Sequence, residues 1–270
     1  MFFRVFILTG WILLLSEPGY TIGGDPPIGG RSAGLANASV MLTDYWSLFH
    51  NQAGLAFFSD PKVGIHHKQG FIKQLSHQAL GVVLPAGNGS IGGSFTYFGF
   101  SAYHEIKTGL TYSMLLDEKL AGSVQLDYFY THIDGYYGNG HVVSSELGLI
   151  YLPFDKLYIG THVFNPLPSS QLGQGKKLPT IFRIGAAYQV QQELLVTLES
   201  EKNLVKAFRM KAGLEYEIID AFFLRTGITT NPVMNSFGIG YTWKEMVLDV
   251  SFTRHMILGF SPQFSLNYSF

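Results

Sequence analysis

An alternation of apolar and polar side chains recurs along most of the chain and limits its fold more than any other feature. From Gln263 to Phe270 every even position is apolar or aromatic and every odd position is polar. Residues 247–254 and 208–217 repeat this order. Because successive side chains of a β-strand point to opposite faces, a period of two predicts strands with one apolar and one polar face.

Fourteen segments show this pattern, which predicts an all-β fold: a transmembrane antiparallel up-and-down β-barrel. An even number of strands is what a bacterial barrel needs, since its first and last strands meet antiparallel. The predicted strands are 61–68, 76–84, 90–99, 103–114, 119–131, 141–152, 156–164, 179–189, 193–201, 206–217, 221–229, 235–243, 246–254 and 262–270.

The connections between these segments alternate in length, which supports the same fold. Every second connection is a short turn, at 85–89, 116–119, 153–155, 190–192, 218–220 and 243–245. The others tend to be longer, at 132–140, 165–178, 230–234 and 255–261. Outer-membrane barrels have short periplasmic turns and longer outer loops. We therefore place the short turns and the C-terminus in the periplasm.

The N-terminus predicts export. Arg4 precedes an apolar run from Val5 to Leu15, the layout of a secretory signal peptide. The run is too short for a membrane helix, which needs about 20 residues; the alternative is a buried N-terminal strand or helix. We assign residues 1–22 to a signal peptide cleaved between Ser16 and Gly24. No later stretch is long enough for a helical span, so we expect a multi-pass β-barrel in the cell outer membrane.

Composition excludes several classes of protein. Charged residues make up 14% of the chain, against about 25% in ordinary soluble domains. With 47% hydrophobic residues and a net charge of -1, the chain is neither disordered nor a nucleic-acid binder. Because it has no cysteine, disulfides, thiolate zinc sites and cysteine nucleophiles are excluded.

The two faces of the predicted strands differ in chemistry. The apolar face suits contact with outer-membrane lipid, and aromatic residues at its ends suit the interface girdles of a barrel: Tyr128, Tyr130, Tyr151, Tyr188, Tyr241, Trp243 and Tyr268. The polar face carries charges of both signs, including Lys107, Glu146, Arg183, Glu199, Glu201, Lys211, Glu215, Arg225 and Asp249. These charges indicate either ion-pair networks that hold an inserted plug or simply a wet polar interior.

The segment 23–58, before the first strand of a barrel at 59–270, does not alternate. It consists of short pieces rich in small residues, and Asp44 is placed to cap a turn that begins at Tyr45. We expect this segment to fill the lumen as a hatch. Arg31 and Asp44 should then meet opposite charges on the inner face, because an unpaired charge in a confined lumen is costly.

Motifs in this segment resemble those of one family. They are Arg31, Ser32, Gly34, Ala36 and Ala38, then Asp44, then Asn51, Gln52, Ala53, Gly54, Leu55 and Ala56. The sequence is similar to outer-membrane barrels related to the fatty-acid transporter FadL and to PorV and PorQ of type IX secretion. Gln52 stands where the transporter branch commonly has Pro. Gln52, with 165–168 and 178–183, looks like the Bacteroidota branch.

The resemblance implies a fourteen-stranded barrel with an N-terminal hatch in the lumen. In the fatty-acid branch, ligands leave sideways through a kink in the third strand. Here that strand contains Gly92 and Gly93, and paired glycines often mark a bulge or bend. The pair therefore predicts either a lateral opening or a place where the wall makes room for the hatch.

Two features near the C-terminus predict partners. The last outer loop contains Ile257, Leu258 and Phe260; an exposed apolar loop indicates contact with a ligand or protein, or insertion into the outer leaflet. The terminal Phe270 resembles the signal read by the barrel-assembly machinery.

We expect no enzyme, metal or cofactor. His66 and His67 are adjacent in a strand, so they face opposite sides and cannot chelate together. The other histidines are scattered, and no Ser–His motif is recognisable. Two functions remain: a passive transport or binding barrel for small hydrophobic compounds, which we favour, or a non-transporting docking barrel for a secretion-system protein, like PorV or PorQ.

Overall fold

A computed structural model describes residues 27–270, apart from 71, 73–74, 136–137, 168 and 170–177. The predicted signal peptide, 1–22, lies outside the described residues. None of the described helices is long and apolar enough to cross a membrane.

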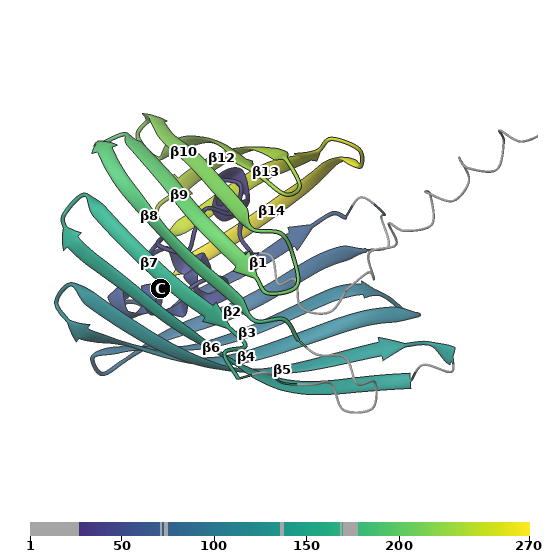
Figure 1. The fold of residues 1–270 in the computed structure, drawn as a ribbon. Coiled ribbons are helices and arrows are strands. Elements are labelled where there is room, and N and C mark those ends of the chain that lie inside the picture. The colour runs from purple at the N-terminus through teal and green to yellow at the C-terminus, as the bar shows by residue number, and fades with distance from the viewer. Residues whose placement is uncertain (1–26, 71, 73–74, 136–137, 168, 170–177) are drawn as a thin grey trace, which may run out of the picture.

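The strands form one closed antiparallel barrel, in which each pairs with its neighbours in sequence and β1 pairs with β14 (Figure 1). This confirms the predicted fold and the number of strands. The strands are β1 Lys62–Lys68, β2 Ser76–Ala86, β3 Gly89–Phe100, β4 Tyr103–Asp117, β5 Leu120–Ile133, β6 Gly138–Phe154, β7 Leu157–Phe164, β8 Ile181–Gln191, β9 Leu194–Asn203, β10 Arg209–Ile219, β11 Phe222–Thr229, β12 Met234–Trp243, β13 Met246–His255 and β14 Gly259–Ser269.

Several strands run further than the alternation predicted. β4 continues to Asp117 past a register shift after Leu115, and β6 begins at Gly138 rather than at residue 141. Backbone hydrogen bonds form equally well beyond the apolar band, where side chains no longer need to alternate. The turns and loops are therefore shorter than expected. We call the barrel end with the short turns the turn end, and the opposite end the loop end.

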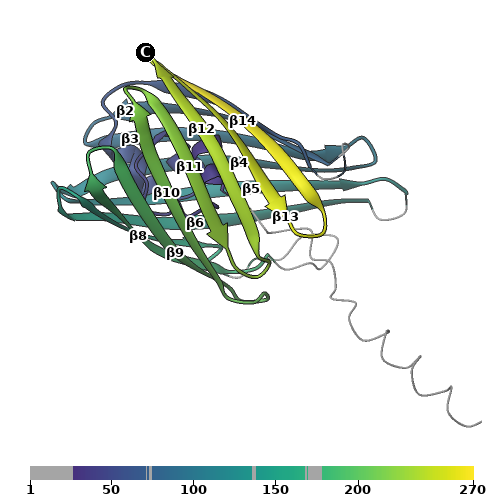
Figure 2. The same ribbon diagram turned by 90° about the horizontal axis from the view of Figure 1, so that it is seen from above.

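The hatch, residues 27–58, lies inside this wall (Figure 2). It contains the helix α1 Gly30–Gly34 and the 3-10 helices η1 Tyr45–Phe49 and η2 Gln52–Phe57. The Asp44 side chain accepts a hydrogen bond from the backbone N–H of Trp46 at 2.8 Å, so the predicted cap at Tyr45 is confirmed. A core of aromatic and aliphatic side chains joins the hatch to β2: Ile28, Tyr45, Trp46, Leu48, Phe49, Leu55, Ala79 and Val83.

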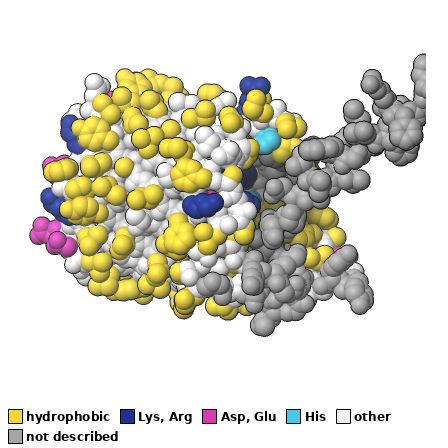
Figure 3. Space-filling view, viewed as in Figure 1, with side chains coloured by type: hydrophobic (Ala, Val, Ile, Leu, Met, Phe, Trp, Pro, Cys, Tyr) yellow, Lys and Arg dark blue, Asp and Glu magenta, His cyan; other side chains and the backbone are white. Residues whose placement is uncertain are grey.

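The outer surface of the wall is apolar. Hydrophobic side chains cover most of the visible wall, and charged ones gather at its turn end (Figure 3). Leu110 and Val143 are 63% and 62% exposed and face outward, as lipid contact requires. The predicted inner-face charges are buried in the lumen, among them Lys107, Glu146, Glu199, Lys211 and Arg225. The prediction of an apolar outer face and a polar inner face is thus confirmed.

We expect the folded barrel to resist detergent until it is heated, because its backbone hydrogen bonds form one closed ring without a free edge. Unboiled and boiled samples should therefore migrate differently on a denaturing gel. Identical mobility, with the protein recovered in the soluble fraction, would contradict a membrane barrel.

Candidate functional site

Glycines on the inner face of the wall allow the hatch to lie directly against it. A Cβ on Gly160 would lie 2.2 Å from the carbonyl oxygen of Val40, and one on Gly148 would lie 2.1 Å from Oδ1 of Asn51. A side chain at Gly160 would displace the hatch backbone, and one at Gly148 would displace the Asn51 side chain. Comparable close approaches occur around the ring at Gly64, Gly81, Gly92, Gly185, Gly213 and Gly227.

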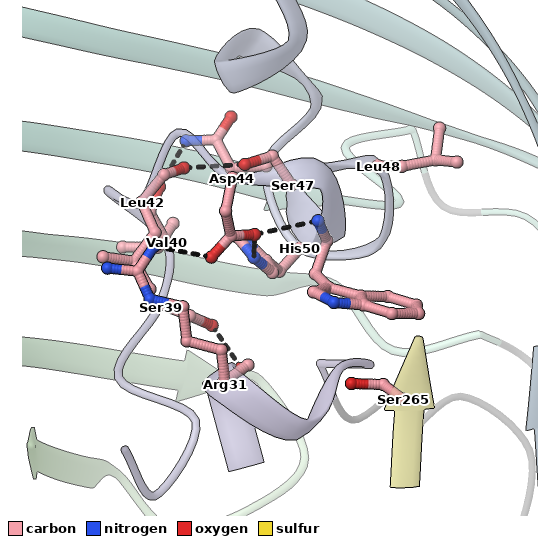
Figure 4. A network of polar contacts seen from close by, with 12 residues as sticks. Arg31, Ser39, Val40, Leu42, Asp44, Ser47, Leu48, His50 and Ser265 are labelled. Carbon is pink, nitrogen blue, oxygen red and sulfur yellow. Dashed lines mark hydrogen bonds and ion pairs between the residues drawn. The ribbon is translucent and has the colours of Figure 1, made fainter. Parts of the chain in front are cut away.

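Arg31 joins the hatch to the wall on the β10 side. Its Nε and Nη2 donate to the two carboxylate oxygens of Glu215, at 2.8 and 2.6 Å. Its Nη1 pairs with Asp44 at 3.0 Å within the hatch (Figure 4). Glu215 also accepts from Arg225, which pairs with Asp249 at 2.6 Å. The expectation of a wall partner thus holds for Arg31. It is wrong for Asp44, which lies against Arg31 and His50 because the hatch folds back on itself.

Glu199 on β9 holds the middle of the hatch. One of its oxygens accepts from the backbone N–H groups of Ser39 and Val40, both at 2.8 Å, and the other pairs with Lys211 at 2.7 Å. A carboxylate that accepts backbone N–H groups and faces an ammonium has its charge satisfied in the dry interior. Lys211 in turn pairs with Glu201 at 2.8 Å.

Glu146 on β6 holds the last turn of the hatch. It accepts from Gln52 Nε2 at 2.8 Å, pairs with Lys107 at 2.7 Å and lies 2.8 Å from Nε2 of His162. The neighbouring Asn51 donates to the carbonyl oxygen of Val40 at 2.6 Å. Gly54 packs against Ser47 within the hatch, where a Cβ would lie 2.6 Å from the Ser47 hydroxyl oxygen. The motif residues Asn51, Gln52 and Gly54 therefore shape and anchor the hatch.

The turn end of the lumen keeps a cavity beside the hatch. It measures about 360 Å³, and its walls include Asp44, Lys62, Thr242, Asp249 and Asn267. Tyr45, Trp46, Phe58, Phe223 and Val247 line it as well, so its lining is mixed.

The loop end of the lumen carries an apolar patch on one side. Val142, Phe164, Leu178 and Ile181 form a buried cluster, and Phe129 packs against it. We call these five residues the apolar patch. The rings of Phe129 and Phe164 meet edge to face at 6.0 Å, and Lys107 Nζ lies 5.5 Å from each ring. The patch is a packed apolar cluster that lies beside the charged Lys107.

Sequence reasoning missed the apolar patch, although the sequence carried a signal for it. Each strand residue of the patch breaks the alternation by standing beside an outward apolar residue. The pairs are Tyr128 with Phe129, Val142 with Val143, Val163 with Phe164, and Ile181 with Phe182. The inward-facing glycines that contact the hatch were also missed. The sequence indicates them by glycine that recurs at positions of the polar face.

Gly92 and Gly93 do not break the third strand. Their neighbours on β2 and β4 pair with them in continuous register, so β3 has no bulge at this pair. Gly92 faces inward, where a Cβ would lie 2.6 Å from Leu48 of the hatch, while Gly93 has no atom within 4 Å of its Cβ position. Gly92 therefore makes room for the hatch, which was the alternative interpretation.

The last outer loop exposes the predicted apolar side chains. Ile257, Leu258 and Phe260 are 87%, 57% and 61% exposed. The Nδ1 atom of His255 accepts from the N–H groups of Ile257 and Leu258, both at 3.2 Å, which fixes the shape of the loop. At the turn end, the N–H of Phe270 donates to Pro61 at 3.0 Å and its ring faces out. Within the described part of the chain, no three His, Cys, Asp or Glu side chains are arranged to hold a metal.

We expect Arg31→Gln to loosen the hatch. The change leaves Asp44 and Glu215 without their shared cation, and a lost hydrogen bond to a charged group costs about 1.5–3 kcal/mol. Single-channel recordings in planar bilayers should then show larger and more frequent openings. Arg254→Gln is the control, because Arg254 is exposed and lies over Phe260 rather than against the hatch. Equal conductance in wild type and Arg31→Gln would contradict this role.

The hatch should stay closed at mildly acidic pH. Burial raises the pKa of Asp44, but His50 and Arg31 lower it more, so the pKa lies well below its usual range. A carboxyl whose pKa is lowered by folding stabilises the fold at every pH above its pKa in the unfolded chain, which is about 3.9. This contribution is lost only as the pH falls below that value. Conductance should therefore be unchanged from pH 7 to pH 5 and rise below about pH 4. A rise already at pH 6 would contradict this assignment.

No protein-family model matches the sequence, and no curated protein matches it either. Solved structures do share the fold. CymD, a monoaromatic hydrocarbon channel, superposes with a TM-score of 0.72 at 13% identity, over 92% of this chain and 99% of that chain. The Ralstonia pickettii toluene transporter TbuX gives 0.69 at 11% identity, over 92% and 99%. The Pseudomonas putida toluene transporter TodX gives 0.64 at 12%, over 91% and 96%. The chain therefore has the fold of these three proteins.

Proposed function

We propose that this chain is an outer-membrane channel for the passive uptake of small hydrophobic compounds. The observation that carries the proposal is the apolar patch, a cluster of buried aromatic and aliphatic side chains at the loop end of the lumen. An apolar surface with a few polar groups nearby is what a site for small hydrophobic ligands requires. The shared fold with channels named for toluene and monoaromatic hydrocarbons supports the same function.

The hatch gives this channel its selectivity. The ion pairs of Arg31, Glu199 and Glu146 hold the hatch across the lumen, and inward glycines let it lie against the wall. A compound that enters from the loop end meets the apolar patch before it meets the hatch. Transfer from water to the patch is favourable for apolar compounds and not for polar ones.

The same proposal covers location and assembly. The exposed apolar wall would lie in outer-membrane lipid. The outward ring of Phe270, in contact with Tyr268 at 5.0 Å, would be read by the barrel-assembly machinery. The chain would reach the membrane through a signal peptide removed between Ser16 and Gly24. A docking role in type IX secretion, in the manner of PorV or PorQ, would use the exposed Ile257 and Leu258 instead, and the shared fold does not favour it.

We expect cells that carry this barrel to take up radiolabelled toluene faster than cells without it. Leu258→Glu should lower the uptake rate several-fold, because a charge on the exposed apolar loop weakens its contact with apolar compounds. Ser101→Glu places the same charge on another exposed loop and should leave uptake unchanged. Uptake equal to that of cells without the barrel would contradict the function. If Leu258→Glu instead releases a co-purifying protein and spares uptake, the docking role replaces ours for this loop.

A further inference from the structure

Histidine and tyrosine side chains gather on the outer face of β3 to β6 at the loop end, where these four strands lie side by side (Figure 1). They are Tyr97, His104, Tyr128, Tyr130, His132 and His141, and we call them the His–Tyr strip. Their positions alternate with buried, inward-facing ones such as Lys107 and Asp127, so they face outward. Closer to the turn end, aliphatic side chains cover the outer face of the same strands, including Leu110, Val124 and Leu126. The strip therefore begins where the apolar belt of the wall ends.

The members of the strip contact one another across the strands. His104 lies directly opposite His132, and their ring centroids are 4.9 Å apart. Tyr130 lies opposite His141, with the ring centroids 5.2 Å apart. Beside this pair, Nδ1 of His132 lies 2.7 Å from Oδ1 of Asn139. Because cross-strand contacts hold the rings in place, the strip is a preformed surface rather than a set of independent side chains.

The strip lies at the level of the membrane interface. On β4, His104 comes twelve residues before Leu116, which lies near the turn end. With a rise of about 3.3 Å per residue and a strand tilt of about 45°, this separation is about 28 Å along the barrel axis. The apolar band of an outer-membrane barrel is about 25 Å tall. The strip would therefore meet lipid headgroups rather than acyl chains, a level that suits side chains with an apolar ring and a polar atom.

The exposed charges at the two ends of the barrel favour an anionic headgroup at the loop end. The turn end exposes the acids Asp60, Asp117, Glu118, Asp155, Glu193, Asp220 and Glu245, together with the cations Lys119, Lys156 and Lys244. Among the residues that the structure describes at the loop end, Asp134 is the only exposed acid. The exposed cations of this end are Lys202, Lys206 and Arg254. An anionic headgroup therefore meets less like-charge repulsion at the loop end than at the turn end.

A headgroup made of sugar rings and phosphate matches the groups that the strip presents. Sugars and phosphates are rich in oxygen atoms that accept hydrogen bonds, and tyrosine hydroxyls, imidazole rings and the Asn139 amide offer donors to them. The flat faces of the tyrosine and histidine rings can cover the apolar faces of sugar rings. Because the strip crosses four strands, it is about 14 Å wide. A surface of this width suits a headgroup larger than a single phosphate.

We propose that the His–Tyr strip binds the phosphorylated sugar headgroup of a glycolipid in the outer leaflet. The acyl chains of this lipid lie along the aliphatic side chains below the strip, such as Leu110 and Leu126. The bound lipid fixes which side of the barrel faces it, because the strip occupies β3 to β6 alone. This inference goes beyond uptake, and it rests on the proposed function only for the location of the barrel in the outer membrane.

Native mass spectrometry of the purified barrel in a neutral detergent, titrated with monophosphoryl lipid A, tests the proposal. His104→Leu and His132→Leu should each weaken lipid A binding about five- to tenfold, because each change removes a hydrogen-bonding ring and keeps a side chain of similar size. Phosphatidylglycerol has a phosphate but no sugar ring, and it should bind the wild type about tenfold more weakly than lipid A does.

Asn235→Leu is the matched control. Asn235 is exposed on the outer face of β12 at the loop end, and β12 lies seven strands from β5 in the closed ring of fourteen, on the opposite side of the barrel. This variant should keep wild-type lipid A binding, and the heat-dependent gel shift reports assembly of every variant. Unchanged lipid A binding in both histidine variants, or an equal loss in Asn235→Leu, would overturn the proposal. Equal binding of phosphatidylglycerol and lipid A would overturn the assignment to a glycolipid.

Toluene uptake measures the proposed function separately. Cells that carry His132→Leu should take up toluene at the wild-type rate, because the strip lies outside the lumen. If wild-type cells show no uptake while lipid A binding still depends on His104 and His132, the proposed function fails and the strip assignment stands. If uptake is normal but lipid A binding ignores both histidines, only the strip assignment is wrong.

Discussion

The close approach of the hatch to the inner wall is the constraint on which the rest of the structure depends. Where a Cβ would lie about 2 Å from hatch atoms, as at Gly148 and Gly160, wall and hatch occupy adjoining space. A wall with ordinary side chains at these positions would hold the hatch further from its polar partners. The glycines therefore allow Glu199 and Glu146 to reach the hatch.

The charges inside the barrel follow from that contact. Burying a charge is costly unless an opposite charge and hydrogen bonds satisfy it. Glu215 meets Arg31 and Arg225, and Glu199 meets Lys211 and two backbone N–H groups. Mixed signs on the inner face thus reflect pairing around an inserted segment. A pore of one sign would instead attract counter-ions and select for charge.

The fold could be predicted from the sequence because a single rule, alternation with period two, operates along every strand. The same rule gave the inward position of Lys107 and Glu146, and Asp44 could be recognised as a cap from its place before Tyr45. The partner of Asp44 could not be predicted, because it depends on how the hatch folds back toward Arg31 and His50. The role of Gly92 could not be predicted from the sequence either. A glycine can mark a bulge or a close contact with a residue such as Leu48, and only the structure distinguishes the two. The sequence signal for the apolar patch was a set of adjacent apolar residues, such as Val142 beside Val143, that interrupt the alternation. These pairs could be interpreted only once it was known which strands are neighbours.

Under the proposed function, small hydrophobic compounds occupy the apolar patch above a closed hatch. The most direct test is a crystal structure of the protein soaked with 4-bromotoluene, with bromine located by its anomalous scattering. We expect bromine beside Phe129 and Phe164, with the hatch unchanged and Arg31 still paired with Glu215. Bromine found only on the outer wall, or in the cavity beside Asp249 and Asn267, would contradict this binding site.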